Sequence, residues 1–456
     1  MARRIILAAA LAALSTAAFA QEAVDPAAER RRAFDAKLFD SPALATPYRD
    51  NLSEDEKVAG LSKFWSEVKY NFVYVDKLKE LDWDRLYLEY LPKVRATAST
   101  AEYYRVLAEL CAKLQDGHTN VYPGAEVRDL LMARPLFTTH LVEGKVLVRE
   151  VFDAALRARG VAPGVEVVAV DGEPVQAYAN RELLPYLSAS TPQDMERRAY
   201  GYSFLTGALT HTPRVSFRSA AGKAFEADTP RVSWDAFVKA AIMKEPFELR
   251  MLPGNVAYVA LNSFGDDRSA DAFLAAFDRI ARASALVIDV RNNGGGNSSV
   301  GYRVLATLAD KPFDTSKWAT RQYLPAYRAW QRPMPDLEKK MDAWPVDDKR
   351  HFSGPVAVLT SGATYSAAED FAVAFDTMKR GILVGEATGG STGQPLLVQL
   401  PGGGRARICT KADTYADGTV WVGKGIQPTV RSAQTLADLR RGRDTVLEAA
   451  LARLGR

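Results

Sequence analysis

Between residues 53 and 115 the apolar positions recur at helical spacing, as in the segment LSKFWSEVKYNF, and this pattern predicts helices. Ser53, with Glu56 three residues later, has the composition of a helix N-cap and its first turn. A second helix is expected over Ser99–Gln115, ended by the turn at Asp116-Gly117. The N-terminal part of the chain is therefore expected to be a small helical domain.

From about residue 136 to residue 232 the pattern changes to short strands. KVLVREV and VEVVAV are separated by DAALRARGVAPG, which predicts a short helix and a Pro-Gly turn, and the second strand is closed by Asp171-Gly172. This order of elements resembles a PDZ domain. The resemblance implies a β-rich module that captures peptides by adding them to a sheet as an extra strand.

After Pro246 strands and helices alternate, which predicts an α/β domain with its chemistry beyond the carboxyl ends of the strands. NVAYVALNSF, ALVIDV, VAVLTS and GILVGEAT are expected strands. Helices are expected in ADAFLAAFDRIARA, over Ser299–Leu308, in SAAEDFAVAFDTMKR and over Leu436–Leu454, with a hairpin through Gly402–Gly404. Residues 310–352 are aromatic, contain proline and lack a clear period, so we interpret them as a lid over a cleft.

The first 20 residues, MARRIILAAALAALSTAAFA, have the features of a secretory signal. Arg3 and Arg4 form a charged start, an apolar run follows, and Ala18-Phe19-Ala20 is an A-x-A cleavage site before Gln21. The apolar run is short for a bilayer core of roughly 30 Å. We therefore expect a signal peptide over residues 1–20, export across the inner membrane to the periplasm, and no stable membrane insertion.

The composition narrows the function further. The 456 residues include 59 Lys and Arg against 55 Asp and Glu, so a net charge of +4 gives no strong field for nucleic acid. Four histidines and two cysteines leave little material for a metal site, and we expect neither a metal nor another cofactor. In a compartment that permits disulfides, Cys111 and Cys409 are nevertheless expected to be two buried thiols.

One candidate nucleophile follows the strand VAVLTS, in the segment SGATYSAAED. Ser366 would lie at a helix N-terminus, which stabilises developing negative charge, and the N–H of Ala367 could donate to an oxyanion. The alternative is a structural role, in which Ser366 caps the helix and Glu369 completes the S-x-x-E capping box. On this segment alone the capping interpretation is favoured.

Two further turns are candidate functional segments, and one motif match is misleading. NNGGGN after ALVIDV exposes backbone N–H groups to an anion, which suits an oxyanion hole or a plain tight turn, but it matches no nucleotide-binding motif. His118 alone among the histidines lies in a Gly-containing turn, LQDGHTN. Ser391, in the G-x-S-x-G match GGSTG, is followed by the strand-like PLLVQL, whereas a nucleophile elbow joins a strand to a helix.

Taken together, LQDGHT, VIDVRNNGGG, TYSAAEDFA, VGEATGGSTGQP and GKGIQP resemble the S41 serine peptidases, in order and spacing over residues 64–428. The resemblance implies a ClpP/crotonase-like α/β catalytic core and a serine peptidase. In the C-terminal processing branch a lysine follows the nucleophile by 25 residues, but here that position is Ser391. The tricorn-like branch uses a histidine at the position of His118. The resemblance therefore implies Ser366 as nucleophile and His118 as general base, with oxyanion-hole N–H groups from Gly294 or Gly295 and from Ala367.

Two positions depart from the family pattern. Tricorn-like members carry a serine immediately before the histidine, where this chain has Gly117. Many relatives carry a glutamate, thought to orient the histidine through other residues, where this chain has Val422 in WVGKGI. Asp413 and Asp417 are the two candidates to replace that acid.

These patterns divide the chain into a signal peptide (1–20), a helical N-terminal domain (21–130), a PDZ-like domain (131–240) and an S41 α/β domain (241–456). The leading hypothesis is an exported serine peptidase that hydrolyses peptides or proteins through an acyl-enzyme. One alternative is a catalytically weak or inactive binding protein for peptides or apolar ligands on the same fold, favoured by the aromatic residues of segment 310–352. Another is an esterase that uses Ser391. The oligomeric state is left open.

Overall fold

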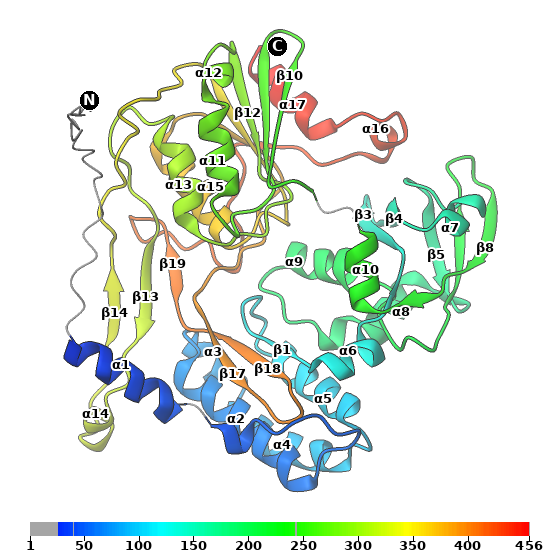
Figure 1. Cartoon of the computed structure of the whole chain (residues 1–456), viewed down its shortest axis with the longest axis vertical. Coiled ribbons are helices and arrows are strands. Elements are labelled where there is room, and N and C mark those ends of the chain that lie inside the picture. The colour runs from blue at the N-terminus through cyan, green and yellow to red at the C-terminus, as the bar shows by residue number, and fades with distance from the viewer. Residues whose placement is uncertain (1–25, 40, 242–243, 456) are drawn as a thin grey trace, which may run out of the picture. The chain divides into compact units, whose positions relative to one another are not determined.

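A computed structural model of the chain describes residues 26–39, 41–241 and 244–455 (Figure 1). The expected signal peptide, residues 1–20, lies outside the described residues. The chain divides into two units, residues 1–43 and Leu44–Arg456. In the first unit the described structure is mainly the helix α1 (Pro26–Phe39). The elements below belong to the second unit, which has a mixed α/β fold with several sheets.

The sheet that carries the candidate chemistry has six strands. Their order is β10 (Phe247–Leu252), β11 (Val256–Leu261), β12 (Ala285–Asp289), β15 (Val356–Thr360), β16 (Ile382–Gly385) and β20 (Val430–Arg431). All neighbours run parallel except β10, which is antiparallel to β11. Every residue of β11, β12 and β15 is buried, which is why these strands are continuous apolar runs in the sequence.

Helices cover both faces of this sheet. Alternate residues such as Val259 and Ile288 pack against one group of helices, whereas Tyr258 and Val287 pack on the other side against α17 (Thr445–Arg453). In Figure 1 the red α17 lies on the other side of the strands from that group. The group comprises α11 (Arg268–Ala275), α12 (Phe277–Ile280), α13 (Ser298–Ala306) and α15 (Ala367–Met378).

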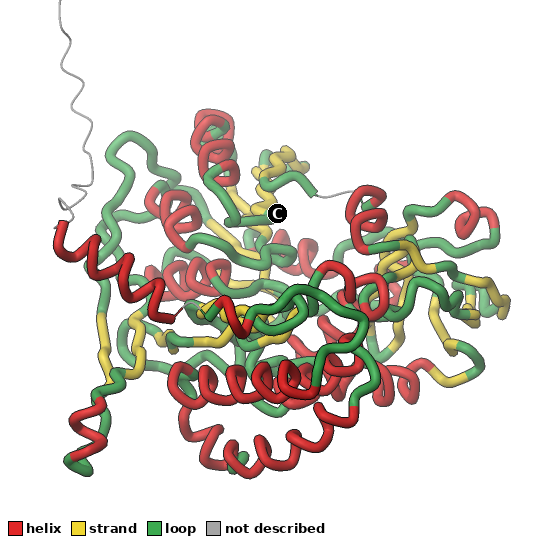
Figure 2. The backbone as a smooth tube through the Cα atoms, turned by 60° about the horizontal axis from the view of Figure 1, so that its bottom comes forward, coloured by secondary structure: helices red, strands yellow, loops and turns green. Residues whose placement is uncertain are grey.

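The N-terminal segment of the second unit is helical, with Ser53 and Glu56 forming a complete capping box. Its core is completed by a hairpin from far along the chain, because Leu400 and Ile408 pack in the same cluster as Phe64. Figure 2 shows these helices in red. They are α2 (Glu54–Asn71), α3 (Val75–Glu80), α4 (Trp83–Ala96) and α5 (Thr100–Ala112), and the hairpin is formed by β17 (Pro395–Gln399) and β18 (Arg405–Cys409), of which β18 also pairs with β1 (Asn120–Tyr122).

The middle of the chain has its own sheet and its own hydrophobic core, drawn only from residues 137–227. The strands are β3 (Phe137–Val142), β4 (Lys145–Val151), β5 (Glu166–Val170), β6 (Glu173–Pro174), β7 (Arg214–Arg218) and β8 (Ala224–Asp228). The flanking elements are α6 (Ala125–Leu131), α7 (Ala154–Ala158), α8 (Val175–Glu182), α9 (Pro192–Glu196), a π-helical turn (Arg197–Tyr202), α10 (Trp234–Ala240) and the pair β2 (Arg134–Pro135) and β9 (Arg231–Val232).

Two local predictions were wrong. The last helix expected over Leu436–Leu454 is broken into α16 (Leu436–Arg440) and α17, because Gly442 adopts a left-handed φ of 70°. The expected lid, 310–352, lines no part of the cavity at the candidate site. Instead it forms a hairpin that pairs with β19; the elements are β13 (Lys317–Arg321), α14 (Pro325–Ala329), β14 (Asp336–Lys339) and β19 (Ala412–Thr414).

Cys111 and Cys409 are free thiols buried in the helical core, as the sequence predicted. Each donates a hydrogen bond to a backbone carbonyl, that of Thr119 and that of Thr392 respectively. In the part of the chain that the structure describes, no helix combines the length and apolarity needed to cross a bilayer.

Candidate active site

Ser366 lies where the turn after β15 enters α15, at the carboxyl end of the parallel strands. Its φ of 55° and ψ of −123° are unusual for a residue with a side chain and differ from the extended conformation of an ordinary N-cap. Glu369 accepts a hydrogen bond from the Ser366 N–H at 3.1 Å, as the S-x-x-E capping box predicts. The Ser366 hydroxyl, however, lies 3.1 Å from His118 Nε2. Backbone strain of this kind is concentrated at functional sites.

His118 connects two serines that are remote in the sequence. Its Nε2 faces Ser366 Oγ, and its Nδ1 lies 2.8 Å from Ser391 Oγ. The ring stacks on Tyr365, with 5.0 Å between centroids and 7° between planes, and is 4% exposed. The structure thus brings together the histidine and serine that the sequence singled out, and it adds Ser391 on the far side of the ring.

Ser391 is fully buried, whereas Ser366 lines a cavity. The segment after Ser391 enters the strand β17 rather than a helix, as its apolar pattern predicted. The Tyr365 hydroxyl accepts a hydrogen bond from Arg198 at 3.0 Å. When the Ser391 oxygen accepts a hydrogen bond from His118 Nδ1–H, the lone pair of Nε2 is left toward Ser366.

A single buried carboxyl group, that of Glu369, ties both serines together. It accepts hydrogen bonds from the Thr388 hydroxyl at 2.5 Å and from three backbone N–H groups, those of Gly390 (2.7 Å), Ser391 (3.1 Å) and Ser366 (3.1 Å). Burial raises the pKa of Glu369 to about 8, although these donors oppose the shift. Glu369 therefore fixes the loop that carries Ser391 relative to Ser366.

The electrostatic surroundings of His118 favour the neutral imidazole. Burial holds the pKa of His118 well below 6.5, and the positive charges of Arg407, Arg198 and Lys411 lower it further. A neutral histidine is in the correct state to accept a proton from Ser366. The imidazolium that forms when it does so is disfavoured by the same surroundings.

The candidate oxyanion donors are not equivalent. The Gly295 N–H already donates to Asn293 Oδ1 at 2.9 Å. Gly294 lines the cavity beside Ser366, and Ala367 is the first residue of α15, where helix N–H groups have no partner within the helix. Gly295 has a different task, because a Cβ there would lie 2.7 Å from Ser366 Cβ, at a φ of 95°. Gly294 and Ala367 are therefore the two better-placed donors.

The two acids considered as orienting residues do not contact His118. Asp413 is buried and accepts hydrogen bonds from Thr392 at 2.9 Å and Lys411 at 2.9 Å, and burial raises its pKa to about 6. Asp417 is exposed and accepts the N–H of Thr419. Neither acid therefore orients the histidine through a direct contact, because the Nδ1 position is taken by Ser391.

Packing explains why a glycine precedes His118. A Cβ on Gly117 would lie 1.9 Å from the Tyr365 hydroxyl and 2.6 Å from Asp194 Oδ2. The Gly117 carbonyl accepts hydrogen bonds from both Arg198 and Arg407, each at 3.0 Å. The serine of the family pattern has no room in this arrangement.

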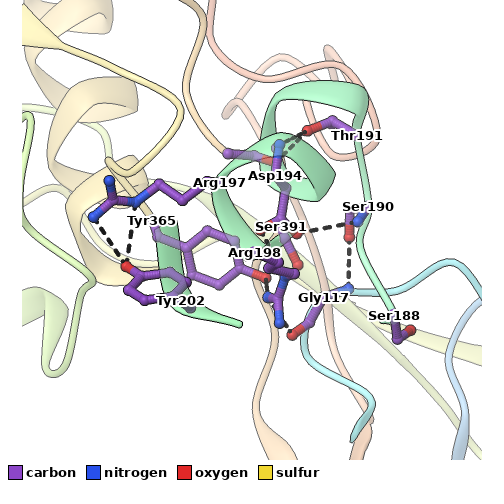
Figure 3. A network of polar contacts seen from close by, with 12 residues as sticks. Gly117, Ser188, Ser190, Thr191, Asp194, Arg197, Arg198, Tyr202, Tyr365 and Ser391 are labelled. Carbon is purple, nitrogen blue, oxygen red and sulfur yellow. Dashed lines mark hydrogen bonds and ion pairs between the residues drawn. The ribbon is translucent and has the colours of Figure 1, made fainter. Parts of the chain in front are cut away.

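The cavity beside Ser366 has a volume of about 420 Å³ and is lined by three arginines. Arg198 pairs with Asp194 at 2.8 Å, and Arg197 contacts the Tyr202 hydroxyl, as Figure 3 shows. The third is Arg407 of β18. None of the aromatic residues of segment 310–352 reaches this cavity. Among the described residues, no cluster of three or more His, Cys, Asp or Glu side chains is arranged to hold a metal ion.

Only one of these additional residues has a signal in the sequence. Ser391 occupies the position, 25 residues after Ser366, at which the processing branch of the family carries its lysine. Tyr365 immediately precedes Ser366, but nothing in the sequence pairs it with His118. Arg198 belongs to the π-helical turn and Arg407 to the hairpin, so only the folded chain brings these two residues close to the site.

Two family models match parts of the chain. Residues 255–432 match the family described as peptidase family S41, and residues 56–112 match the tricorn protease C1 domain.

Solved structures show a similar fold. The structure of mature CPAF complexed with lactacystin is 14% identical, with a TM-score of 0.70 over 88% of this chain and 97% of that one. That of mature CPAF is 15% identical, with a TM-score of 0.68 over 85% and 94%. A putative peptidase from Parabacteroides merdae ATCC 43184 is 18% identical, with a TM-score of 0.50 over 89% and 97%. At such identities the likeness is one of fold.

Proposed function

We propose that this chain, a serine-type peptidase that belongs to family S41, hydrolyses peptide bonds through an acyl-enzyme formed on Ser366. The observation that carries the proposal is the hydrogen bond of 3.1 Å between Ser366 Oγ and His118 Nε2 beside an open cavity. A nucleophilic serine needs an adjacent base within this reach. The unusual backbone of Ser366 supports catalysis over simple helix capping.

In the proposed reaction His118 accepts the hydroxyl proton as Ser366 attacks the substrate carbonyl carbon. The N–H groups of Gly294 and Ala367 donate to the oxyanion of the tetrahedral intermediate. His118 then gives its proton to the leaving amine, and the bond to the amine breaks to leave the acyl-enzyme. Water, activated by the same histidine, attacks the acyl carbon and releases Ser366.

Ser391 serves in this proposal as the residue that orients His118, in place of an acid. Accepting a hydrogen bond from Nδ1–H fixes both the tautomer and the plane of the ring. A hydroxyl brings no negative charge, so it stabilises the imidazolium less than a carboxylate would. We therefore propose a Ser366–His118–Ser391 arrangement that works more slowly than one with an acid.

Labelling with a fluorophosphonate probe tests the assignment. We expect the purified protein to be labelled, and expect Ser366→Ala and His118→Ala to abolish labelling or nearly so. The matched serine variant, Ser391→Ala, should still be labelled at a reduced rate. Labelling that survives in Ser366→Ala but disappears in Ser391→Ala would instead support the esterase hypothesis.

The second candidate function is a binding protein without turnover. The absence of a carboxylate at His118 favours it, since the described contacts give the ring only hydroxyl partners. The cavity does not suit an apolar ligand, because arginines line it. A folded protein that no fluorophosphonate labels would support the binding function over catalysis.

We further propose that residues 131–240 form the PDZ-like domain that presents peptides, between the helical domain (21–130) and the catalytic domain (241–456). The separate core within residues 137–227 supports this division. Export to the periplasm, through cleavage of a signal peptide over residues 1–20, is part of the same proposal. N-terminal sequencing of the protein recovered from the periplasm should begin at Gln21, and a start at Met1 would contradict the export step.

A further inference from the structure

The cavity beside Ser366 carries an excess of positive charge. Its lining includes the guanidinium groups of Arg197, Arg198 and Arg407, and one carboxylate, that of Asp194. Asp194 pairs with Arg198 at 2.8 Å, with side chains 4% and 18% exposed. This pair is nearly neutral as a unit. Arg198 is further occupied by the Gly117 carbonyl and the Tyr365 hydroxyl, so it is a structural element of the site.

The other two guanidinium groups have only neutral partners. Arg197 donates to the Tyr202 hydroxyl from Nε (3.2 Å) and Nη2 (3.1 Å). Arg407 donates from Nε to Asn120 Oδ1 (2.9 Å) and from Nη2 to the Gly117 carbonyl (3.0 Å). Neither forms an ion pair with any residue that the structure describes.

Such an arrangement suits an anion that arrives with the substrate. Partly buried cations in a concave site concentrate positive potential there. A guanidinium group matches the two oxygens of a carboxylate and binds it more strongly than it binds a neutral acceptor. Arg407 also donates a hydrogen bond to the carbonyl of Gly117, the residue before His118, so a group bound to Arg407 is close to the reacting atoms.

We propose that Arg197 and Arg407 bind a carboxylate of the substrate, so that the preferred substrates present an acidic side chain or a free carboxyl terminus in the cavity next to the scissile bond. This inference rests on the proposed peptidase function and names the substrate class of that same site. Arg197 and Arg407 act as specificity-determining residues that contact substrate.

A bound carboxylate would affect the rate as well as the affinity. His118 becomes positively charged in the transition state, next to Arg407 and Arg198 and without an acid on Nδ1. A substrate carboxylate on Arg407 offsets this positive charge and so stabilises the imidazolium. The substrate therefore supplies the negative charge that the site itself lacks, and both kcat and KM depend on it.

Three fluorophosphonate probes of equal chain length, ending in a carboxylate, a carboxamide or a methyl group, test the proposal. The second-order labelling rate is measured for the protein, for Arg197→Gln and Arg407→Gln, and for Arg279→Gln as a matched control on the exposed surface of α12. We expect the carboxylate probe to react about 10-fold faster than the carboxamide probe, a typical effect of one charge-assisted hydrogen bond. This ratio should fall toward one in Arg197→Gln and Arg407→Gln and persist in Arg279→Gln.

The outcomes distinguish a failure of the proposed peptidase function from a failure of carboxylate recognition. Labelling by none of the probes overturns the proposed function, and the inference with it. Equal labelling by the carboxylate and carboxamide probes overturns the inference alone, as does a ratio that both Arg197→Gln and Arg407→Gln preserve.

Competition distinguishes the two sources of a carboxylate. An acetylated heptapeptide amide with a central Glu, its Gln counterpart, and the Gln peptide with a free carboxyl terminus are added to the labelling reaction. Protection by the Glu peptide assigns the site to acidic side chains, and protection by the free-terminus peptide assigns it to chain ends. Equal protection by all three, or protection by none, contradicts carboxylate recognition.

Discussion

The substitution Ser391→Ala tests whether a buried hydroxyl can stand in for the acid of a catalytic triad. The hydroxyl oxygen lies 2.8 Å from His118 Nδ1, and both groups are shielded from water. In the ground state the bond joins two neutral groups and contributes about 1 kcal/mol. In the transition state the donor is an imidazolium, and a hydrogen bond of a charged group contributes about 1.5–3 kcal/mol.

Only the difference between the two states affects the rate. It amounts to about 1–2 kcal/mol, which corresponds to a decrease in kcat of roughly 5- to 30-fold in Ser391→Ala. The loss is far smaller than the roughly 10⁴-fold loss when the acid of a Ser-His-Asp triad is replaced by its amide. KM should change little, because Ser391 does not line the cavity.

Two measurements check this reasoning. The rate of fluorophosphonate labelling, or kcat on a cleaved peptide, gives the size of the effect. Nitrogen-15 NMR of the four histidines gives the tautomer directly. We expect His118 to carry its proton on Nδ1 in the protein and to shift toward Nε2 in Ser391→Ala. An unchanged rate with an unchanged tautomer would refute the orienting role, and complete loss of labelling would refute its magnitude.

Three further predictions follow from the same contacts. Because burial and neighbouring cations lower the pKa of His118, the base remains deprotonated at acid pH, and the acid limb of kcat/KM against pH should lie below pH 6.5; a limb at or above pH 6.5 would contradict this. In Gly117→Ser the new Cβ would displace the Tyr365 hydroxyl, so we expect the labelling rate to fall by about 10-fold or more and the Tm to decrease. Both are measured beside Ser391→Ala, and an unchanged rate and Tm would contradict the packing argument. Burial raises the pKa of Glu369 from 4.5 to about 8, so the folded state binds more protons than the unfolded state in that window, and stability should fall as pH rises through it by up to about 5 kcal/mol. Urea unfolding at pH 5 and pH 8 should show this decrease in the free energy of unfolding in the protein and not in Glu369→Gln. An equal decrease in both would assign the pH dependence to other groups.

Local patterns were sufficient where an element's character depends on its neighbours in sequence. Continuous apolar runs predicted the buried parallel strands such as β12 and β15, and the Ser53-x-x-Glu56 signature predicted the start of α2. The last helix was misjudged because a single left-handed glycine, Gly442, interrupts an otherwise helical pattern. The hairpin within 310–352 was misread as a lid, because its strands are specified by pairing with β19, which lies far along the chain.

The sequence by itself determined the candidates: Ser366 at a strand-to-helix junction and His118 in a polar turn. It did not decide between helix capping and catalysis for Ser366, since the same S-x-x-E pattern serves both. That decision required the tertiary structure, which gives the backbone conformation of Ser366 and places His118, 248 residues away in sequence, at hydrogen-bond distance. The role of Ser391 likewise depends on an approach across 273 residues. Hydrogen bonds of a few ångströms between remote segments are set by the packing of the whole second unit, and no local pattern encodes them.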